Sequence, residues 1–190
     1  MKVVAFNGSP RKEGNTDILV RQVFTELHKE GIETELVELA GLKIRGCTAC
    51  YGCFTNRDKR CVIDDDLNGC IEKMIDADGI ILASPTYFAN VSSEMKALID
   101  RAGLVSRAND DLFRRKIGAA VVAVRRGGAC SVFNAINAFF LMSQMIVPGS
   151  IYWNMGFGLE RGEVREDEEG LRTMKVLAGN MAWLLKKTRG

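Results

Sequence analysis

The sequence predicts an α/β protein in three layers, with a doubly wound sheet of about five parallel strands in the order 2-1-3-4-5 and helices on both faces. Short apolar runs alternate with longer segments whose apolar residues recur at helical spacing. Two of the short runs, residues 79–83 and 117–124, are apolar throughout, as strands buried on both faces require. Right-handed crossovers between such strands place helices on both sides of the sheet.

The N-terminal segment predicts a strand, a polar loop and a helix. Residues 3–6 are apolar, and residues 7–10 (Asn-Gly-Ser-Pro) leave the strand in a sharp turn. Residues 15–17 (Asn-Thr-Asp) can cap a helix whose apolar residues recur at helical spacing. That helix is expected to end near residues 29–31, where a glycine can close it.

A loop between a strand and a helix start is a site for an anion, because free helix amides and the helix dipole favour negative charge there. Ser9, Asn15 and Thr16 can add side-chain donors, and Arg11 and Lys12 can add positive charge. Neither GxxxxGK[ST] nor GxGxxG occurs, so the loop indicates a mononucleotide phosphate rather than ATP or a dinucleotide. The alternative is a surface turn that carries two solvated cations.

The remaining elements follow in alternation, and we treat residues 1–190 as a single domain. Predicted strands lie at 35–39, 79–83, 117–124 and 151–153, and predicted helices begin at 67 and span about 92–103, 130–146 and 168–187. Residues 40–66 form the one irregular insert, and a loop of that length in a compact domain is usually functional. Its three aspartates at 64–66 are expected to cap the next helix.

The insert carries a cysteine pattern that can ligate a cluster. Three cysteines follow C-x2-C-x2-C spacing and a fourth lies eight positions on: Cys47, Cys50, Cys53 and Cys61. Such a run lets three thiolates converge on one 4Fe–4S cluster, which the fourth closes. Redox-active thiols and zinc stay open as alternatives, and Val62 stands where ferredoxin-type runs often carry proline. Cys70 and Cys130 fall on apolar helices and are expected to be buried as small hydrophobic residues.

Three segments carry a resemblance to known proteins: NGSPRKEGNTD at 7–17, ASPTYFANVSSEMKALIDR at 83–101 and, between them, CTACYGCFTNRDKRC at 47–61. The first two resemble the NADPH-dependent FMN reductase family of flavodoxin-like proteins, and the third resembles its iron–sulfur flavoprotein branch. The resemblance spans residue 2 to about residue 128. It implies a flavodoxin-like fold, bound FMN, a 4Fe–4S cluster, NAD(P)H as a possible substrate, and a homodimer or homotetramer.

Ligands of open α/β sheets bind beyond the carboxyl ends of the strands, where the loops 8–16, 84–90 and 125–128 are expected to meet. The second loop offers an aromatic and apolar wall for a flavin ring: Pro85, Thr86, Tyr87, Phe88 and, at its end, Asn90. The third loop offers Arg125, whose charge suits an anionic reduced flavin, and Gly127 and Gly128, which allow close backbone approach. Tyr87 and Phe88 can instead be ordinary core residues. No side chain need be an acid or base, because hydride transfer is the flavin's own chemistry.

Composition excludes several other classes. A net charge of +2, with 47% hydrophobic and 26% charged residues, indicates an ordinary globular protein and no nucleic-acid partner. The N-terminal apolar run is too short for a signal peptide or a membrane span, so we expect a cytoplasmic protein with reduced thiols. The single histidine, His28, is expected to be a solvated residue late in the first helix.

These features predict an FMN-dependent oxidoreductase or electron-transfer flavoprotein whose 4Fe–4S cluster exchanges electrons with FMN. Two alternatives remain: a cluster-free NAD(P)H-dependent FMN or quinone reductase, and a zinc-binding scaffold without catalysis. The electron donor can be NAD(P)H or a ferredoxin. The apolar segment 139–142 favours an assembly that covers it.

Overall fold

The computed structural model describes residues 1–189, which form one parallel five-stranded sheet in the order β2-β1-β3-β4-β5. The predicted fold class and strand order are confirmed. The strands are β1 (Lys2–Asn7), β2 (Glu33–Glu38), β3 (Gly79–Pro85), β4 (Ile117–Val124) and β5 (Met155–Phe157). The helices are α1 (Asn15–Lys29), α2 (Gly52–Asn56), α3 (Leu67–Asp76), α4 (Ser93–Ala108), α5 (Ala129–Met142), the 3-10 turn η1 (Glu163–Glu166) and α6 (Glu168–Arg189).

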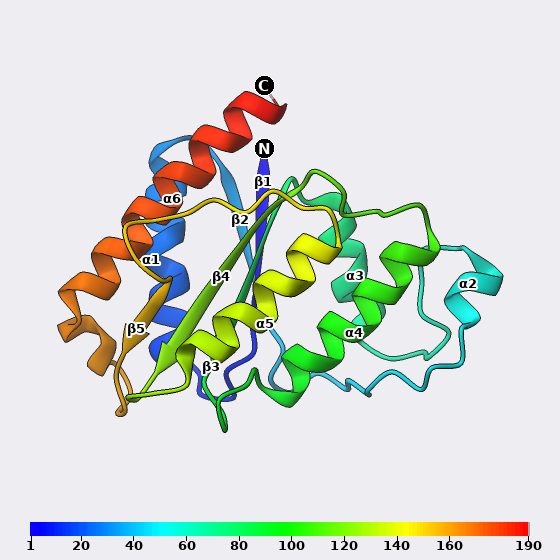
Figure 1. The fold of residues 1–190 in the computed structure, drawn as a ribbon, viewed down its shortest axis with the longest axis horizontal. Helices are drawn as coiled ribbons and strands as arrows, with labels where there is room; N and C mark the ends of the chain where they lie inside the picture. The colour runs from blue at the N-terminus through cyan, green and yellow to red at the C-terminus, as the bar shows by residue number, and fades with distance from the viewer. Residues whose placement is uncertain (190) are drawn as a thin grey trace.

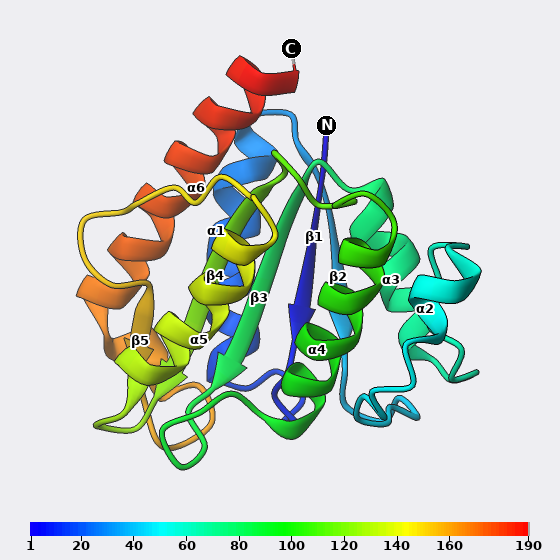
Figure 2. The ribbon, with the colours of Figure 1, turned by 45° about the vertical axis from the view of Figure 1, so that its right-hand side comes forward.

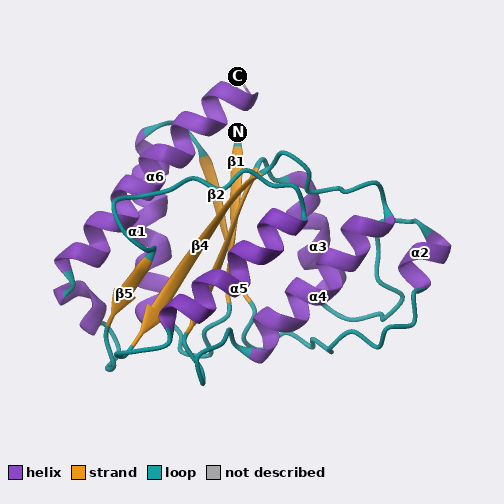
Figure 3. Ribbon diagram, in the orientation of Figure 1, coloured by secondary structure: helices purple, strands orange, loops and turns teal. Residues whose placement is uncertain are grey.

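Helices cover both faces of the sheet (Figures 1 and 3). On one face α3, α4 and α5 pack over alternate strand residues such as Phe6, Leu82 and Val122. On the other face α1 and α6 pack over the residues that point the opposite way, such as Ala5 and Ile81. The central strands β3 and β4 are buried on both sides, so residues 79–83 and 117–124 are apolar throughout, as parallel sheets require. The edge strand β2 is only half-buried.

All strands end at one edge of the sheet, where the loops after β1, β3, β4 and β5 gather (bottom of Figure 1). The start of β1 and the end of α6 lie at the opposite edge, as Figure 2 also shows. The insert between β2 and α3 departs to the side of the sheet and carries the short helix α2, which the sequence did not predict. Within the described chain, no helix is both long enough and apolar enough to cross a membrane.

The fifth strand is four residues later than predicted. Residues 151–153 (Ile-Tyr-Trp) have high strand propensity, yet they are exposed in a bend, and residues 155–157 pair with β4 instead. Gly156 explains the choice: a Cβ there would lie 2.7 Å from Leu19 Cδ2 and from Val164 Cγ2. The slot between α1 and η1 admits backbone only, so a glycine and not an aromatic residue occupies it.

Three helix ends also differ from the predictions. The N-cap of α1 is Gly14 and not one of residues 15–17, which lie buried in the first turn. Helix α4 runs to Ala108, five residues beyond the expected end. Helix α5 stops at Met142 and not at the predicted residue 146. Ile146 instead forms a parallel bridge with Ile117, the first residue of β4.

Candidate functional site

A cavity of about 180 Å³ opens at the carboxyl edge of the sheet. Eight of the predicted site residues line it: Ser9, Arg11, Asn15, Thr16, Pro85, Thr86, Tyr87 and Arg125. Four further lining residues were not predicted: Ala123, Val124, Gly158 and Leu159. The loops after β1, β3, β4 and β5 thus meet around one cavity, which combines hydroxyl, guanidinium and backbone groups with an aromatic wall.

Hydrogen bonds within the loop after β1, and from this loop to β3, fix its conformation. The Ser9 amide donates to Asn7 Oδ1 at 3.0 Å, and the Arg11 amide donates to Ser9 Oγ at 3.2 Å. Gly8 donates to the Ala83 carbonyl at 2.8 Å, which fixes the loop against β3. These bonds turn the chain so that α1 points its N-terminus at the cavity, with Thr16 in its first turn. The helix end can therefore receive an anion.

Residues 158–162 close one side of this loop, and the sequence analysis missed them. Arg11 Nη1 donates to the Leu159 carbonyl at 2.9 Å, and Asn15 Nδ2 donates to the Glu160 carbonyl at 2.9 Å. Asn15 Oδ1 also accepts from the Gly162 amide at 2.9 Å. The Asn15 side chain thus holds the neighbouring loop rather than standing free. The only sequence signal was the glycine-rich stretch GFGLERG after the mispredicted strand.

The loop after β3 folds into a tight hairpin. Tyr87 and Asn90 exchange both backbone hydrogen bonds, at 3.0 and 2.9 Å. Phe88 and Ala89 at its tip have φ values of +47° and +57°, which is unusual for residues other than glycine. Gly128, with φ +88°, lies against this hairpin, since a Cβ there would be 3.1 Å from Ala89 Cα. The turn after β4 therefore positions the aromatic loop.

Five predicted site residues do not line the cavity. Phe88 is fully exposed and Tyr87, which does line the cavity, is partly exposed, so the core-packing alternative is wrong for both. The Asn90 side chain accepts from the Val91 amide, which supports the hairpin. Lys12 and Gly127 lie outside the lining, and Gly128 contacts the hairpin.

The four cysteines of the insert line a second cavity: Cys47, Cys50, Cys53 and Cys61. Helix α4 closes its inner side with Arg101, Leu104 and Val105. All four thiols are free of disulfides. Their convergence from 47–53 and from 61 onto one place is the arrangement that a cluster with four thiolate ligands needs.

Unusual backbone conformations concentrate in this insert. Ala49, Tyr51, Arg57 and Lys59 all have φ between +50° and +64°. Non-glycine residues adopt this region at a cost, and such residues gather where a ligand or a mechanism requires them. The αL residues let the chain turn between successive cysteines without glycine at each step.

The environments of the thiols differ. The Gly52 amide and the Thr48 hydroxyl lower the pKa of Cys50, whereas burial raises the pKa of Cys53. The Ala49 amide donates to Cys47 Sγ at 3.4 Å. Amide-to-sulfur hydrogen bonds of this kind surround ligands of iron–sulfur clusters and tune them.

The cysteine spacing fits a cluster better than a single zinc ion. Four thiolates without a nitrogen ligand are a donor set that both structural zinc and iron–sulfur clusters take, so the ligand type does not separate the two. Structural zinc sites usually take paired ligands from two separated segments, whereas here three cysteines follow C-x2-C-x2-C and a fourth lies eight positions on. Three thiolates at this spacing can converge on one 4Fe–4S cluster.

The cysteines outside the insert and the histidine complete the comparison with the sequence. Cys70 is buried as expected, but Cys130 is exposed in the first turn of α5, so that prediction is wrong. The helix turns its small polar residues outward there and buries Ala129 and Val132 instead. His28 is exposed at the end of α1, as predicted, with Nε2 2.6 Å from Thr34 Oγ1.

Comparison with known proteins assigns the family. The family model described as NADPH-dependent FMN reductase matches residues 1–160. The chain belongs to the NADPH-dependent FMN reductase family. An iron-sulfur flavoprotein of Methanocaldococcus jannaschii is 40% identical, covering 98% of this chain and 98% of its own. An iron-sulfur flavoprotein of Methanosarcina thermophila is 35% identical, covering 98% of this chain and 96% of its own.

Solved structures support the same fold. The structure of RosB with a bound 8-demethyl-8-formylriboflavin-5'-phosphate intermediate aligns with a TM-score of 0.74 at 18% identity, covering 100% of this chain and 82% of RosB. The predicted family resemblance, including its iron–sulfur flavoprotein branch, is thus confirmed. As a member of the FMN reductase family, the chain falls in the predicted class of FMN-dependent oxidoreductases and electron-transfer flavoproteins.

Proposed function

We propose that this FMN reductase family member binds FMN in the cavity at the carboxyl edge and a 4Fe–4S cluster on the four cysteines of the insert, and that electrons pass between them. The observation that carries the proposal is the presence of two separate cavities, one lined by the phosphate loop and an aromatic wall and one lined by Cys47, Cys50, Cys53 and Cys61. FMN can accept two electrons as one hydride and release them one at a time, and an iron–sulfur cluster carries single electrons.

Each predicted residue has a proposed part in FMN binding. Ser9, Thr16 and the amides of the first turn of α1 hold the phosphate, and Arg11 supplies positive charge. Asn15 acts by fixing residues 160–162, which close the phosphate site. Lys12 contributes charge from outside the cavity.

The flavin ring has a proposed place between the other loops. Pro85, Thr86 and Tyr87 would form its wall, and Arg125 would place a positive charge beside the ring, which suits an anionic reduced flavin. Asn90 supports the hairpin by accepting from the Val91 amide, and Gly128 packs against residue 89. Phe88 lies at the exposed tip and Gly127 faces open space, so we assign neither of them a contact with the ring.

The electron donor is proposed to be NAD(P)H, as in the family description, or a small carrier such as ferredoxin. We further propose a cytoplasmic location, where thiol ligands stay reduced, and a homodimer or homotetramer. An apolar groove between α4 and α5, flanked by the exposed side chains of Leu141 and Met142, supports the assembly.

The test is an anaerobic titration with NADPH and then with dithionite, followed by visible absorbance. We expect two flavin bands above a broad iron–sulfur shoulder, and we expect the flavin bands to bleach with NADPH. Reduced ferredoxin, added in place of NADPH, tests the second donor. Flavin bands over a baseline without the shoulder, together with zinc in the sample, would contradict the cluster and leave only the FMN site.

A further inference from the structure

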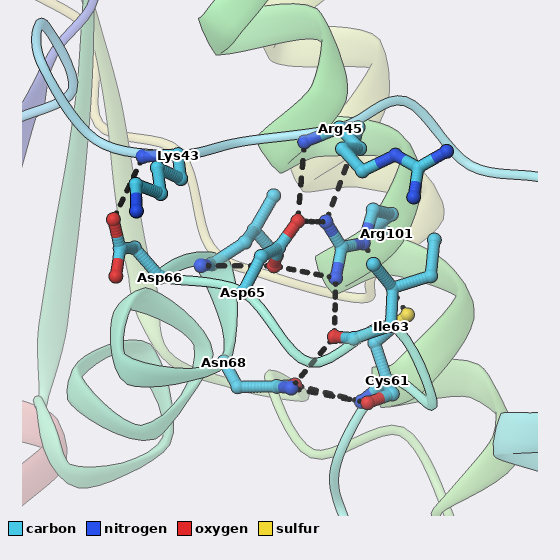
Figure 4. Close-up of polar contacts among 9 residues, drawn as sticks. Lys43, Arg45, Cys61, Ile63, Asp65, Asp66, Asn68 and Arg101 are labelled. Atoms are coloured by element: carbon cyan, nitrogen blue, oxygen red, sulfur yellow. Dashed lines mark hydrogen bonds and ion pairs between the residues drawn. The ribbon is translucent and has the colours of Figure 1, made fainter.

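Arg101 of α4 is a charged side chain buried beneath the cysteine insert (Figure 4). It is 1% exposed and is the largest of the fully buried side chains in the described chain. Burial of a guanidinium is costly unless every N–H finds an acceptor. Its partners therefore show what the buried charge does.

The guanidinium forms hydrogen bonds with the chain on both sides of the four cysteines. Nη1 donates to the Arg45 carbonyl at 3.0 Å, ahead of the first cysteine, and Nη2 donates to the Ile63 carbonyl at 3.1 Å, after the last one. The same two nitrogens form a bidentate pair with Asp65, at 2.6 and 2.9 Å. One side chain thus closes the segment 46–62 that carries all four cysteines.

Asp65 also joins the two sides of the cysteine segment, through hydrogen bonds with backbone amides. Its Oδ2 also accepts from the Arg45 amide at 3.1 Å, and its Oδ1 accepts from the Leu67 amide at 3.2 Å. Burial alone would raise the pKa of Asp65, but Arg101 and these amides outweigh it and hold that pKa below its usual value. Asn68 joins the same end, since its side chain bonds the Cys61 amide and the carbonyls of Cys61 and Ile63.

The fifth N–H of the guanidinium, on Nε, contacts one of the four cysteines. Arg101 Nε donates to Cys61 Sγ at 3.3 Å, so all five N–H groups have acceptors: two carbonyls, two carboxylate oxygens and one sulfur. The planar fork of arginine matches this set, whereas the ammonium of lysine offers three donors around one point. Arginine is therefore the residue type that the site requires.

We propose that Arg101 is a positioning residue for the cluster: it holds the cysteine insert closed, and its Nε–H stabilises the negative charge that reduction places on the Cys61 sulfur. The inference rests on the proposed function. One-electron reduction, with dithionite as the electron source when the midpoint potential is measured, would add one negative charge to the cluster and its ligands and move no proton. A hydrogen bond to the sulfur favours that form and so raises the reduction potential.

The main test is the double variant Arg101→Met, Asp65→Asn. Arg101→Met alone would leave the Asp65 carboxylate buried and unpaired, whereas the pair removes one charge of each sign and leaves the net charge unchanged. A shift in potential then reports the lost N–H to sulfur bond rather than a change in overall charge. FMN content shows whether the fold survives, because Arg101 does not line the FMN cavity.

We expect the double variant to keep FMN, to release iron to a chelator at least tenfold faster, and to show a cluster midpoint potential lower by about 59 mV or more, which is a tenfold change for one electron. Arg101→Lys should likewise speed the release of iron and lower the midpoint potential. If the double variant loses FMN, this single variant tests the role of Arg101 in its place. Arg57→Ala is the control, because Arg57 lies in the same insert but pairs with Asp110 at the surface.

The possible results distinguish a failure of this inference from a failure of the proposed FMN and cluster function. A cluster with unchanged potential and unchanged chelator resistance in the double variant would overturn the role of Arg101 and leave the cluster assignment intact. An unaltered protein that holds FMN without iron or sulfide would overturn the cluster and this inference together. An Arg57→Ala variant that shifts the potential as much as the double variant would show that any change in the insert suffices.

Discussion

Arg11 joins two parts of the candidate FMN site that are distant in the sequence. It lies in the loop after β1 and donates to the carbonyl of Leu159, in the loop after β5. The sequence predicts its charge but not this partner, because the loop at 158–162 follows a strand that was placed four residues too early. A guanidinium already fixed in this way would bind a phosphate with little further loss of side-chain freedom.

Arg11→Ala should weaken FMN binding by roughly 1–3 kcal/mol, the range of a charge-assisted hydrogen bond. Thr16→Ala should weaken it as well, by about 1 kcal/mol for a neutral hydroxyl. Fluorescence titration of the apoprotein with FMN measures both. Arg21→Ala is the control, because Arg21 pairs with Asp17 on the outside of α1 and does not line the cavity. Equal FMN affinity in all of these proteins would rule out the phosphate site.

The two cysteines outside the insert should differ in reactivity. Burial raises the pKa of the Cys70 thiol to about 11, so very little thiolate exists near neutral pH, whereas Cys130 is exposed. Iodoacetamide at pH 8 should alkylate Cys130 in the folded protein and leave Cys70 unmodified until the protein unfolds. Peptide mass mapping follows both sites in one sample. Equal alkylation rates at the two cysteines would contradict the burial of Cys70.

Glu35 contributes stability with a pH dependence of known sign. It pairs with Lys2 at 2.7 Å and with Lys73, and these two cations lower its pKa. A carboxyl with a lowered pKa stabilises the fold above its unfolded pKa, about 4.3, and loses that contribution as the pH falls further. Glu35→Gln should therefore cost about 0.5–1 kcal/mol at pH 7 and less at pH 3, by urea unfolding. An equal loss at both pH values would contradict the ion pairs.

At the scale of the elements, the alternation of strands and helices was predictable because burial on both faces leaves a plain apolar pattern. The exact ends of the helices and strands were less predictable, because they depend on contacts with residues far away in the sequence. Helix α5 ends early because Ile146 pairs with Ile117, and β5 begins late because only Gly156 fits against Leu19. No local pattern records either contact.

The turn after β4 gives a test at the same scale. Gly128 has φ +88° and touches the hairpin at 86–89, whereas Gly127 faces open space and has an ordinary φ. Gly128→Ala should cost about 1 kcal/mol or more of stability and should lower FMN affinity by displacing the hairpin. Gly127→Ala is the matched control and should change neither. Thermal unfolding and FMN titration measure the two effects, and identical results for both variants would contradict the contact.

At the scale of the whole molecule, the FMN cavity and the cysteine cavity have no lining residue in common. The first lies at the carboxyl edge of the sheet, and the second is lined by residues of α4 and of the insert that carries α2. Figure 2 shows that insert at the side of the molecule. The sequence predicts eight of the twelve residues that line the first cavity and all four cysteines that line the second, because thiol spacing and loop composition are local. It does not predict Arg101, whose five acceptors are brought together only by the fold.

The most direct measurement is the content of FMN, iron and acid-labile sulfide per chain in anaerobically reconstituted protein. For the unaltered chain we expect one FMN with four iron and four sulfide, the composition of one 4Fe–4S cluster. Cys53→Ser should lose iron and sulfide and keep FMN, whereas Cys130→Ser should keep all three. FMN without iron or sulfide in the unaltered chain would contradict the central claim.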